Sequence, residues 1–321
     1  MKPVLAALAL AGALLPLSAQ PPQAAIANSK VKATLYLPDP TRGYYRGTRF
    51  DWSGSIASLE ANGHTYFGKW FDRYDPKTHD AITGPVEEFL TGDSALGYDE
   101  AGPGETFIRI GVGTLRKIQE PKFERFKTYD IVDPGKRTET HGADWIEFTH
   151  ELTGPNGYAY LYTKRLSLTP GQAELVISHT LKNTGRKAID TSVYNHDFYM
   201  IDNLPTGPDV RVVFPFAPQA LGKLAPLAET SGHELRYLTE LATGQSAASE
   251  ITGYGPTPAD YDFRVENRKA GAGVRQRGDL PISKLYFWSI RTTVCPEAYV
   301  HLHIEPGQEV SWKIRYEFYA L

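Results

Sequence analysis

Cysteine is nearly absent from this sequence, since Cys295 is the only one among 321 residues. A lone cysteine excludes a disulfide framework within the chain. It stands between Val294 and Pro296, where we interpret it as a small buried apolar side chain. The fold must therefore be held together by its hydrophobic core.

An excess of basic charge is also lacking. The 34 Lys and Arg residues are outnumbered by 37 Asp and Glu residues, which gives a net charge of −3. Such a balance leaves no basic surface for nucleic acid, and we expect no nucleic-acid partner. After residue 20 no apolar run is long enough to cross a bilayer, so we expect no membrane span.

The longest apolar run lies at the N-terminus, in residues 1–19, MKPVLAALALAGALLPLSA. Lys2 precedes the run and small residues surround Ala19, which is typical of a secretory signal peptide. The run is short for a membrane span. We therefore expect residues 1–19 to be removed, residues 20–30 to form a flexible segment, and the mature protein to be periplasmic or secreted. The sequence gives no indication of the oligomeric state.

Helical periodicity is scarce as well, and residues 233–244, HELRYLTELATG, are the best helix candidate. Turn residues are abundant instead, with 29 Gly and 23 Pro. The clearest hairpin joins residues 144–152 to residues 158–168 through TGPNG, and both arms alternate apolar and polar residues. We predict an all-β protein, with residues 31–321 forming a single large antiparallel β-sandwich.

Aromatic residues are plentiful, with 19 Tyr, 14 Phe and 5 Trp. Flat aromatic faces pack against the apolar faces of sugar rings, so this composition favours a protein that binds a mono- or oligosaccharide. Trp52, Trp70 and Trp288 are the residues from which we expect a stacking face in a cleft.

Three consecutive polar residues interrupt an apolar strand in residues 193–202, VYNHDFYMID. Asn195, His196 and Asp197 are costly there unless they are hydrogen-bonded or face a cavity. Alternation along a strand places His196 on one face and the two flanking side chains on the other. We therefore predict that His196 faces a cleft.

A second pair of histidines, His301 and His303, has the spacing that puts both side chains on one face of a strand. Together with Glu305 they form a candidate metal site, which makes a metal-dependent enzyme one alternative. By contrast, His150 and His179 each share a strand face with apolar residues, and we interpret both as core histidines.

Two longer blocks resemble the galactose mutarotase (aldose 1-epimerase) superfamily. In residues 174–201, ELVISHTLKNTGRKAIDTSVYNHDFYMI, the Asn-Thr-Gly turn at 183–185 is followed by Asn195, His196 and an aromatic residue. Residues 292–319, TTVCPEAYVHLHIEPGQEVSWKIRYEFY, are similar to the segment that carries the superfamily's catalytic glutamate, and Glu297 fits that position. Short segments at 54–68 and 162–168 resemble other strands of the superfamily.

This resemblance implies a sugar mutarotase that works without a cofactor or a metal, with His196 and Glu297 as catalytic residues. The nearest candidates for the superfamily's sugar-holding arginine and second histidine are Arg46 or Arg49 and His79. We expect Arg49, His79, Asp197, Trp52 and Trp288 to bind the sugar. Asp197 replaces the superfamily's usual Thr after the Asn-His pair. The alternative from another class is a non-catalytic carbohydrate-binding β-sandwich with the same fold.

Interconversion of sugar anomers requires a base at the anomeric hydroxyl and an acid at the ring oxygen. An imidazole titrates near pH ~6.5, so His196 is expected to be the acid and a glutamate the base. Glu297 and Glu305 compete for the second role. Glu305 precedes a Pro-Gly turn, whereas Glu297 follows Pro296, which in a sheet often marks a bulge that re-aims a side chain. We favour Glu297.

Overall fold

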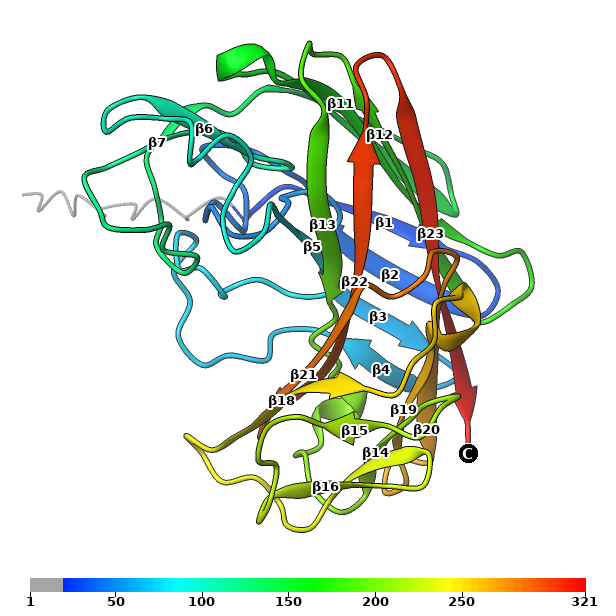
Figure 1. Cartoon of the computed structure of the whole chain (residues 1–321). Helices are drawn as coiled ribbons and strands as arrows, with labels where there is room; N and C mark the ends of the chain where they lie inside the picture. The colour runs from blue at the N-terminus through cyan, green and yellow to red at the C-terminus, as the bar shows by residue number, and fades with distance from the viewer. Residues whose placement is uncertain (1–19) are drawn as a thin grey trace, which may run out of the picture.

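The structure is a computed structural model that describes residues 20–321, so the predicted signal peptide lies outside the described residues. The described chain is built from antiparallel strands, as Figure 1 shows. Three short 3₁₀ helices interrupt them: η1 (Pro155–Gly157), η2 (Ile201–Asn203) and η3 (Pro258–Asp260). This confirms the predicted all-β class. No helix among residues 20–321 is long and apolar enough to span a membrane.

The largest sheet has ten strands. In spatial order these are β16 (Ala228–Ser231), β17 (Glu234–Tyr237), β14 (Val210–Val213), β19 (Asp262–Asn267), β20 (Ala272–Gly278), β23 (Glu309–Ala320), β12 (Glu174–Asn183), β11 (Ala159–Leu168), β10 (Trp145–Thr153) and β9 (Lys136–His141). The predicted hairpin is β10–β11, joined through η1, and its strands pair from Trp145 opposite Ser167 to Thr153 opposite Ala159.

A six-stranded sheet packs over the large one. Its strands, in spatial order, are β15 (Gln219–Ala220), β18 (Ser246–Thr252), β21 (Lys284–Ile290), β22 (Thr293–Ile304), β13 (Ile189–His196) and β5 (Val86–Leu90). Aromatic side chains join the two layers: Phe89 of β5 meets the ring edges of Tyr162 and Trp312, with centroids 5.4 and 6.4 Å away. The two sheets therefore enclose one core, as a sandwich requires.

Two small sheets flank the sandwich. One contains β1 (Gln23–Ala27), β2 (Val31–Tyr36), β3 (Ile56–Ala61) and β4 (His64–Phe67), and the other contains β6 (Thr106–Arg109), β7 (Gly113–Arg116) and β8 (Ile131–Asp133). Phe67 at the end of β4 packs against Phe318 of β23, which fixes the first small sheet to the large one.

Two local expectations are corrected. Part of the segment expected to be flexible, residues 20–30, forms β1, because its backbone pairs with β2 from Gln23 to Ala27 and Ile26 is buried. The helix candidate at residues 233–244 instead forms β17. There Leu235 and Tyr237 are both buried, because alternation in a strand points both toward the core.

Candidate active site

The site lies on the face of the six-stranded sheet that points away from the core. Tyr194 of β13 pairs with Glu88 of β5 on one side and with Tyr299 of β22 on the other. Glu297, two residues before Tyr299, pairs with Tyr286 of β21. Because every second residue of a strand faces the same side, this register collects polar and aromatic side chains from four strands on one surface.

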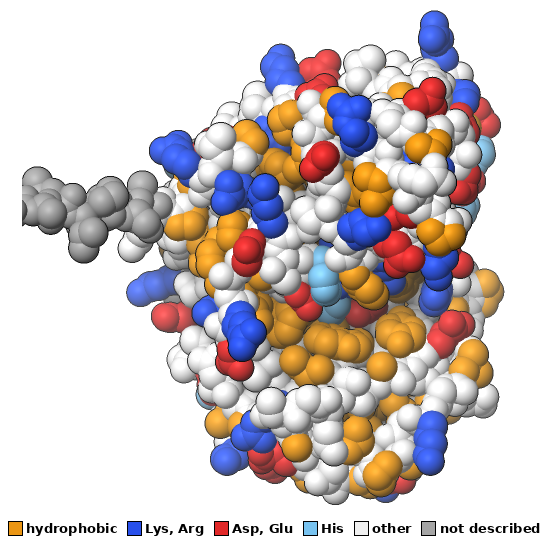
Figure 2. Space-filling model, turned by 90° about the vertical axis from the view of Figure 1, so that its left-hand side faces the viewer, with side chains coloured by type: hydrophobic (Ala, Val, Ile, Leu, Met, Phe, Trp, Pro, Cys, Tyr) orange, Lys and Arg blue, Asp and Glu red, His pale blue; other side chains and the backbone are white. Residues whose placement is uncertain are grey.

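Loops cover this surface and turn it into a pocket of about 350 Å³, a volume typical of small-molecule sites. Figure 2 shows a hollow near the middle of this face, with histidine at its upper edge and hydrophobic side chains below it. The pocket is lined by Arg49, Trp70, His79, Asp80, Arg125, Phe126, His196, Phe198, Lys284, Tyr286, Trp288, Glu297 and Tyr299.

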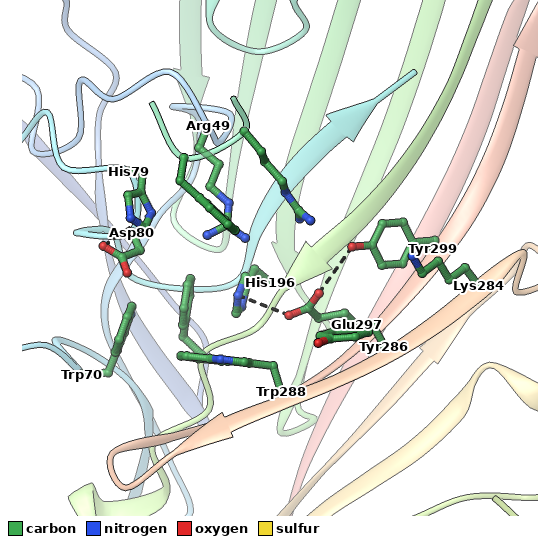
Figure 3. Close-up of a pocket in the computed structure, with 13 residues that line it drawn as sticks. Arg49, Trp70, His79, Asp80, His196, Lys284, Tyr286, Trp288, Glu297 and Tyr299 are labelled. Carbon is green, nitrogen blue, oxygen red and sulfur yellow. Dashed lines mark hydrogen bonds and ion pairs between the residues drawn. The ribbon is translucent and has the colours of Figure 1, made fainter. Parts of the chain in front are cut away.

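Two of these side chains face each other at the pocket floor. His196 Nε2 lies 3.3 Å from Glu297 Oε1, and both side chains are 5 % exposed. The Tyr299 hydroxyl donates to the other oxygen of Glu297 across 3.5 Å. Figure 3 shows both interactions. The histidine and glutamate chosen from the sequence are thus neighbours, because β13 and β22 are adjacent antiparallel strands.

Aromatic packing holds the imidazole in place. Phe198 stacks on His196 with centroids 3.8 Å apart and an interplanar angle of 8°, and Trp70 stacks on the other side of Phe198 at 4.6 Å. The Nδ1 atom of His196 has no hydrogen-bond partner within residues 20–321, so the ring contacts and the approach of Nε2 to Glu297 orient the imidazole. Phe198 has a φ of 48°, a strained conformation for a bulky residue of the kind that clusters at functional sites.

The pair carries one shared proton near neutral pH. Burial raises the pKa of Glu297 to about 8, against the opposing effect of Arg49 and Arg125. Burial and then the positive charge of Arg49 lower the pKa of His196 well below its usual value. With the pKa of Glu297 above neutral pH and that of His196 below it, the proton resides on Glu297 at pH 7, whereas the sequence led us to expect it on His196. The reason is desolvation, which disfavours the charged form of each group.

A cluster of charges that sequence analysis missed lies beside this pair. Glu88 is fully buried and bonds to Arg49 (2.8 Å), Arg109 (2.9 Å) and Arg125 (2.7 Å), and it accepts the Tyr194 hydroxyl at 2.6 Å. Burial alone would raise the pKa of Glu88, but Arg49, Arg125 and Arg109 hold it well below the usual range. Glu88 therefore stays ionised and anchors two arginines that line the pocket.

The structure places three of the five predicted sugar-binding residues at the pocket: Arg49, His79 and Trp288. The other two lie elsewhere. Trp52 is buried, its indole N–H donates to the Gly47 carbonyl at 2.8 Å, and it borders a separate hollow of about 680 Å³. The pocket is instead walled by Trp70, the third tryptophan considered for stacking.

Asp197 also lies away from the pocket, which corrects its expected role in sugar binding. It is fully buried and accepts a hydrogen bond of 2.9 Å from the Tyr316 hydroxyl of β23. Its neighbour Asn195 donates to Glu87 at 3.0 Å, and Glu87 also pairs with His179 of β12 at 2.9 Å. The flanking residues of His196 thus bind groups between the two sheets, as strand alternation predicts.

The histidines of the metal alternative lie outside the pocket, on the exposed part of β22. His303 engages Asp190 at 2.8 Å and Glu305 at 3.1 Å, while His301 Nε2 is 3.7 Å from Asp190. No group of three or more His, Cys, Asp or Glu side chains in the described chain is arranged to hold a metal. Glu305 is 64 % exposed, so Glu297 rather than Glu305 faces His196.

The sequence carries a signal for some of the other pocket residues and none for others. Lys284, Tyr286 and Trp288 alternate along β21, so strand periodicity around Trp288 was a usable signal for the other two. Arg125 and Phe126 come from a loop without periodicity, and nothing in their local sequence points to the pocket.

Comparison with known proteins gives no match to a family model and none to a curated protein sequence. Solved structures do match. A galactose mutarotase-like protein from Lactobacillus casei ATCC 334 has a TM-score of 0.55 and 14% identity, covering 93% of this chain and 100% of that one. An aldose epimerase homologue from C. elegans has a TM-score of 0.53 and 13% identity, covering 94% and 99%.

A third match is a protein from Synechocystis sp. PCC 6803, with a TM-score of 0.58, 12% identity, and coverage of 94% of this chain and 97% of that one. At such identities a likeness establishes the fold and not the activity. The sheets described above and these matches agree along most of the chain, and the protein has the galactose mutarotase-like β-sandwich fold.

Proposed function

We propose that this protein is a sugar mutarotase of the aldose 1-epimerase type, which interconverts the α and β anomers of a pyranose. One observation carries the proposal: His196 and Glu297 face each other at 3.3 Å at the floor of an aromatic-lined pocket. Structural neighbours named as mutarotase-like or aldose epimerase proteins support the same reaction class.

The reaction needs two proton transfers at one end of the sugar. A base removes the proton from the anomeric hydroxyl while an acid protonates the ring oxygen, and the ring opens. The open chain turns about the bond next to its carbonyl carbon. The ring oxygen then attacks the other face, and both protons return to their starting positions. The two groups must therefore hold one proton between them at the start and at the end.

His196 and Glu297 meet that requirement. When a sugar binds, hydrogen bonds from its hydroxyls add to the one from Tyr299 and favour the carboxylate form of Glu297, which lowers its pKa further. The proton then passes to His196 across the short Nε2–Oε1 gap. In this arrangement Glu297 is the base and His196 the acid, as the sequence resemblance implies.

The pH dependence of activity follows from the shared proton. The pKa of Glu297 is about 8, so kcat/KM should fall above about pH 8, where the free enzyme loses that proton. Burial and Arg49 lower the pKa of His196, so the fall on the acid side should begin well below the usual imidazole range. These limits belong to the pair and not to either residue alone.

The decisive test is polarimetry of freshly dissolved α-glucose and α-galactose with Glu297→Gln and His196→Asn. Each substitution should lower the rate by ~10²–10⁴-fold, the usual contribution of an acid–base group. The double variant should lose little more, because the two groups act as a unit. Glu305→Gln is the matched control and should stay within about twofold of the wild type, since Glu305 is exposed at the sheet rim. A large loss in Glu305→Gln with near-normal Glu297→Gln would overturn the assignment.

A non-catalytic sugar-binding protein is the alternative, and the aromatic walls formed by Trp70 and Trp288 are equally suited to binding. Tryptophan fluorescence separates the two functions. A fluorescence change on adding sugar, without any acceleration of mutarotation by the wild type, would favour the binding protein.

We also propose that the protein is exported, on the basis of the apolar run in residues 1–19. Protein recovered from the periplasm or medium should begin soon after Ala19. An intact Met1 in that material would contradict the proposal.

A further inference from the structure

The charge beneath the pocket is unbalanced. Three guanidinium groups, those of Arg49, Arg109 and Arg125, surround the single carboxylate of Glu88. Glu88 is 0 % exposed, while Arg109 and Arg49 are 2 % and 8 % exposed. Arg125 is 29 % exposed and reaches the pocket. Two positive charges are therefore left without a carboxylate beneath and beside the pocket, where a further anion would be favourable.

Two of these arginines have donor atoms available to a ligand. Arg49 uses Nε for Glu88 and Nη2 for Tyr194, and Arg125 uses Nε and Nη2 for Glu88 and Tyr194. In the described chain, the Nη1 atom of each makes no hydrogen bond, and both side chains line the pocket. Such paired guanidinium donors suit a carboxylate or phosphate.

The rest of the lining does not cancel this charge. Lys284 adds a cation at the rim, half-exposed and 4.0 Å from Glu250. Asp80 is the acidic residue at the opposite rim, beside His79. The pair of His196 and Glu297 shares one proton and is neutral overall at pH 7, as described above.

Arg49 and Arg125 are also correctly placed relative to the reacting pair, His196 and Glu297. Figure 3 shows Arg49 reaching the pocket from one side of His196, while Trp288 lies on the other side and Glu297 beside it. Phe126 lies against both guanidiniums, with its ring centroid 4.8 Å from Arg49 and 5.7 Å from Arg125. A pyranose whose anomeric end meets His196 and Glu297 can thus direct a substituent at its far end toward the arginines.

We propose that the substrate is an anionic sugar, which carries a carboxylate or phosphate that Arg49 and Arg125 bind while its anomeric centre meets His196 and Glu297. This inference rests on the proposed mutarotase activity for the reaction but not for the binding. The reaction is an isomerisation, so no atoms or electrons are gained or lost and the anionic group is unchanged.

The first experiment measures kcat/KM for mutarotation of glucose, glucuronate and glucose 6-phosphate, and of the galactose counterparts, by polarimetry or NMR. We expect at least one anionic form to exceed its neutral parent by about 10-fold or more, in the range of a charge-assisted interaction. A preference for the carboxylate or for the phosphate identifies the source of the anion. Equal or better turnover of the neutral sugars would overturn the inference.

A second experiment separates binding from catalysis. The methyl glycoside of glucuronate cannot open its ring, so its affinity, compared with that of methyl glucoside by calorimetry, reports recognition alone. Tighter binding of the anionic glycoside supports the inference even if no sugar is turned over, a result that would defeat only the mutarotase proposal. The methyl glycoside of glucose 6-phosphate completes the comparison, and equal affinity of all three glycosides would contradict the inference whatever the activity.

The variant Arg125→Gln tests directly whether the guanidinium group of Arg125 binds the anionic substituent of the sugar. It should reduce the preference for the anionic over the neutral sugar by about 10-fold, mainly through KM, while Arg125→Lys should restore part of it. Arg49 and Arg109 still hold Glu88 in this variant, so folding should persist. Arg186→Gln removes one positive charge from an exposed residue that does not line the pocket, and it should leave the preference unchanged. An unaltered preference in Arg125→Gln would contradict the inference.

Discussion

At the scale of single residues, Glu297 combines a function with a cost to stability. A carboxyl group buried beside an imidazole is favourable when neutral and unfavourable when ionised. Its pKa is about 8 in the folded protein, raised by burial, whereas an unfolded chain has an ordinary glutamate near ~4.3. The neutral carboxyl therefore contributes stability below the unfolded pKa, and this contribution is lost as pH rises through the folded pKa.

Glu297→Gln should therefore become more stable relative to the wild type as pH rises. Between pH 5.5 and 9 the difference in free energy of unfolding should move by about 3 kcal/mol in favour of the variant. Urea unfolding of both proteins at several pH values measures it. A difference that stays constant between pH 5.5 and 9 would show that the folded pair of His196 and Glu297 holds no extra proton, and would contradict the raised pKa of Glu297.

Glu88 has the opposite character, because three arginines keep it ionised. Glu88→Gln preserves the size of the side chain but leaves the buried guanidiniums without a counter-charge. Breaking a buried ion pair from one side costs about 3–5 kcal/mol, and we expect a loss in that range at pH 7. Chemical denaturation measures it, with Glu305→Gln as the exposed control. A loss below about 1 kcal/mol would mean that water or another anion already screens the cluster.

At the scale of elements, one close approach joins a pocket loop to the strand of His196. A Cβ added at Gly84 would meet the backbone oxygen of Asp197, which cannot move without disturbing β13. The loop that ends at Gly84 also delivers Trp70 and His79 to the pocket. A glycine is thus needed at this point for both segments to reach the site.

Gly84→Ala should consequently destabilise the protein by about 1–3 kcal/mol, the usual range for overpacking, and should raise KM for the sugar. Gly68→Ala is the matched control in the same loop, because a Cβ there meets only the Ala57 oxygen at 3.9 Å. Equal stability and KM in the two variants would show that the backbone at Gly84 yields easily.

The element scale also shows where local patterns mislead. Residues 233–244 have a spacing of apolar residues that fits a short helix, yet Glu234–Tyr237 forms β17. Its neighbours decide the outcome, because β14 and β16 offer backbone hydrogen bonds on both sides. Pairing partners distant in sequence override a weak local preference.

At the scale of the whole molecule, residues 20–321 bring no three His, Cys, Asp or Glu side chains together in an arrangement that could hold a metal ion. Exhaustive dialysis against a chelator should therefore leave the thermal midpoint and the mutarotase rate unchanged. Calorimetry and polarimetry before and after dialysis, with metal analysis of the protein, provide the test. Loss of activity together with stoichiometric zinc or iron would revive the alternative based on His301 and His303.

The sequence by itself determined the features that depend on short-range patterns. Alternation of apolar and polar residues, with turn residues between the segments, specifies antiparallel strands and hence a sandwich. The same alternation separated His196 from Asn195 and Asp197 and placed them on opposite strand faces. The pairing of His196 with Glu297 came from the motifs of the superfamily, and the register of β13 with β22 is its physical cause.

Only the tertiary structure decided which side chains share the pocket with that pair. Trp52 and Asp197 looked suitable for binding sugar but are buried elsewhere, while Glu88 and Arg125 gave no local indication of their part. Loops bring these residues together, and their paths depend on contacts between distant segments that no sequence period records. The charge of the pocket, and with it the proposed anionic substrate, therefore became visible only once the chain was folded.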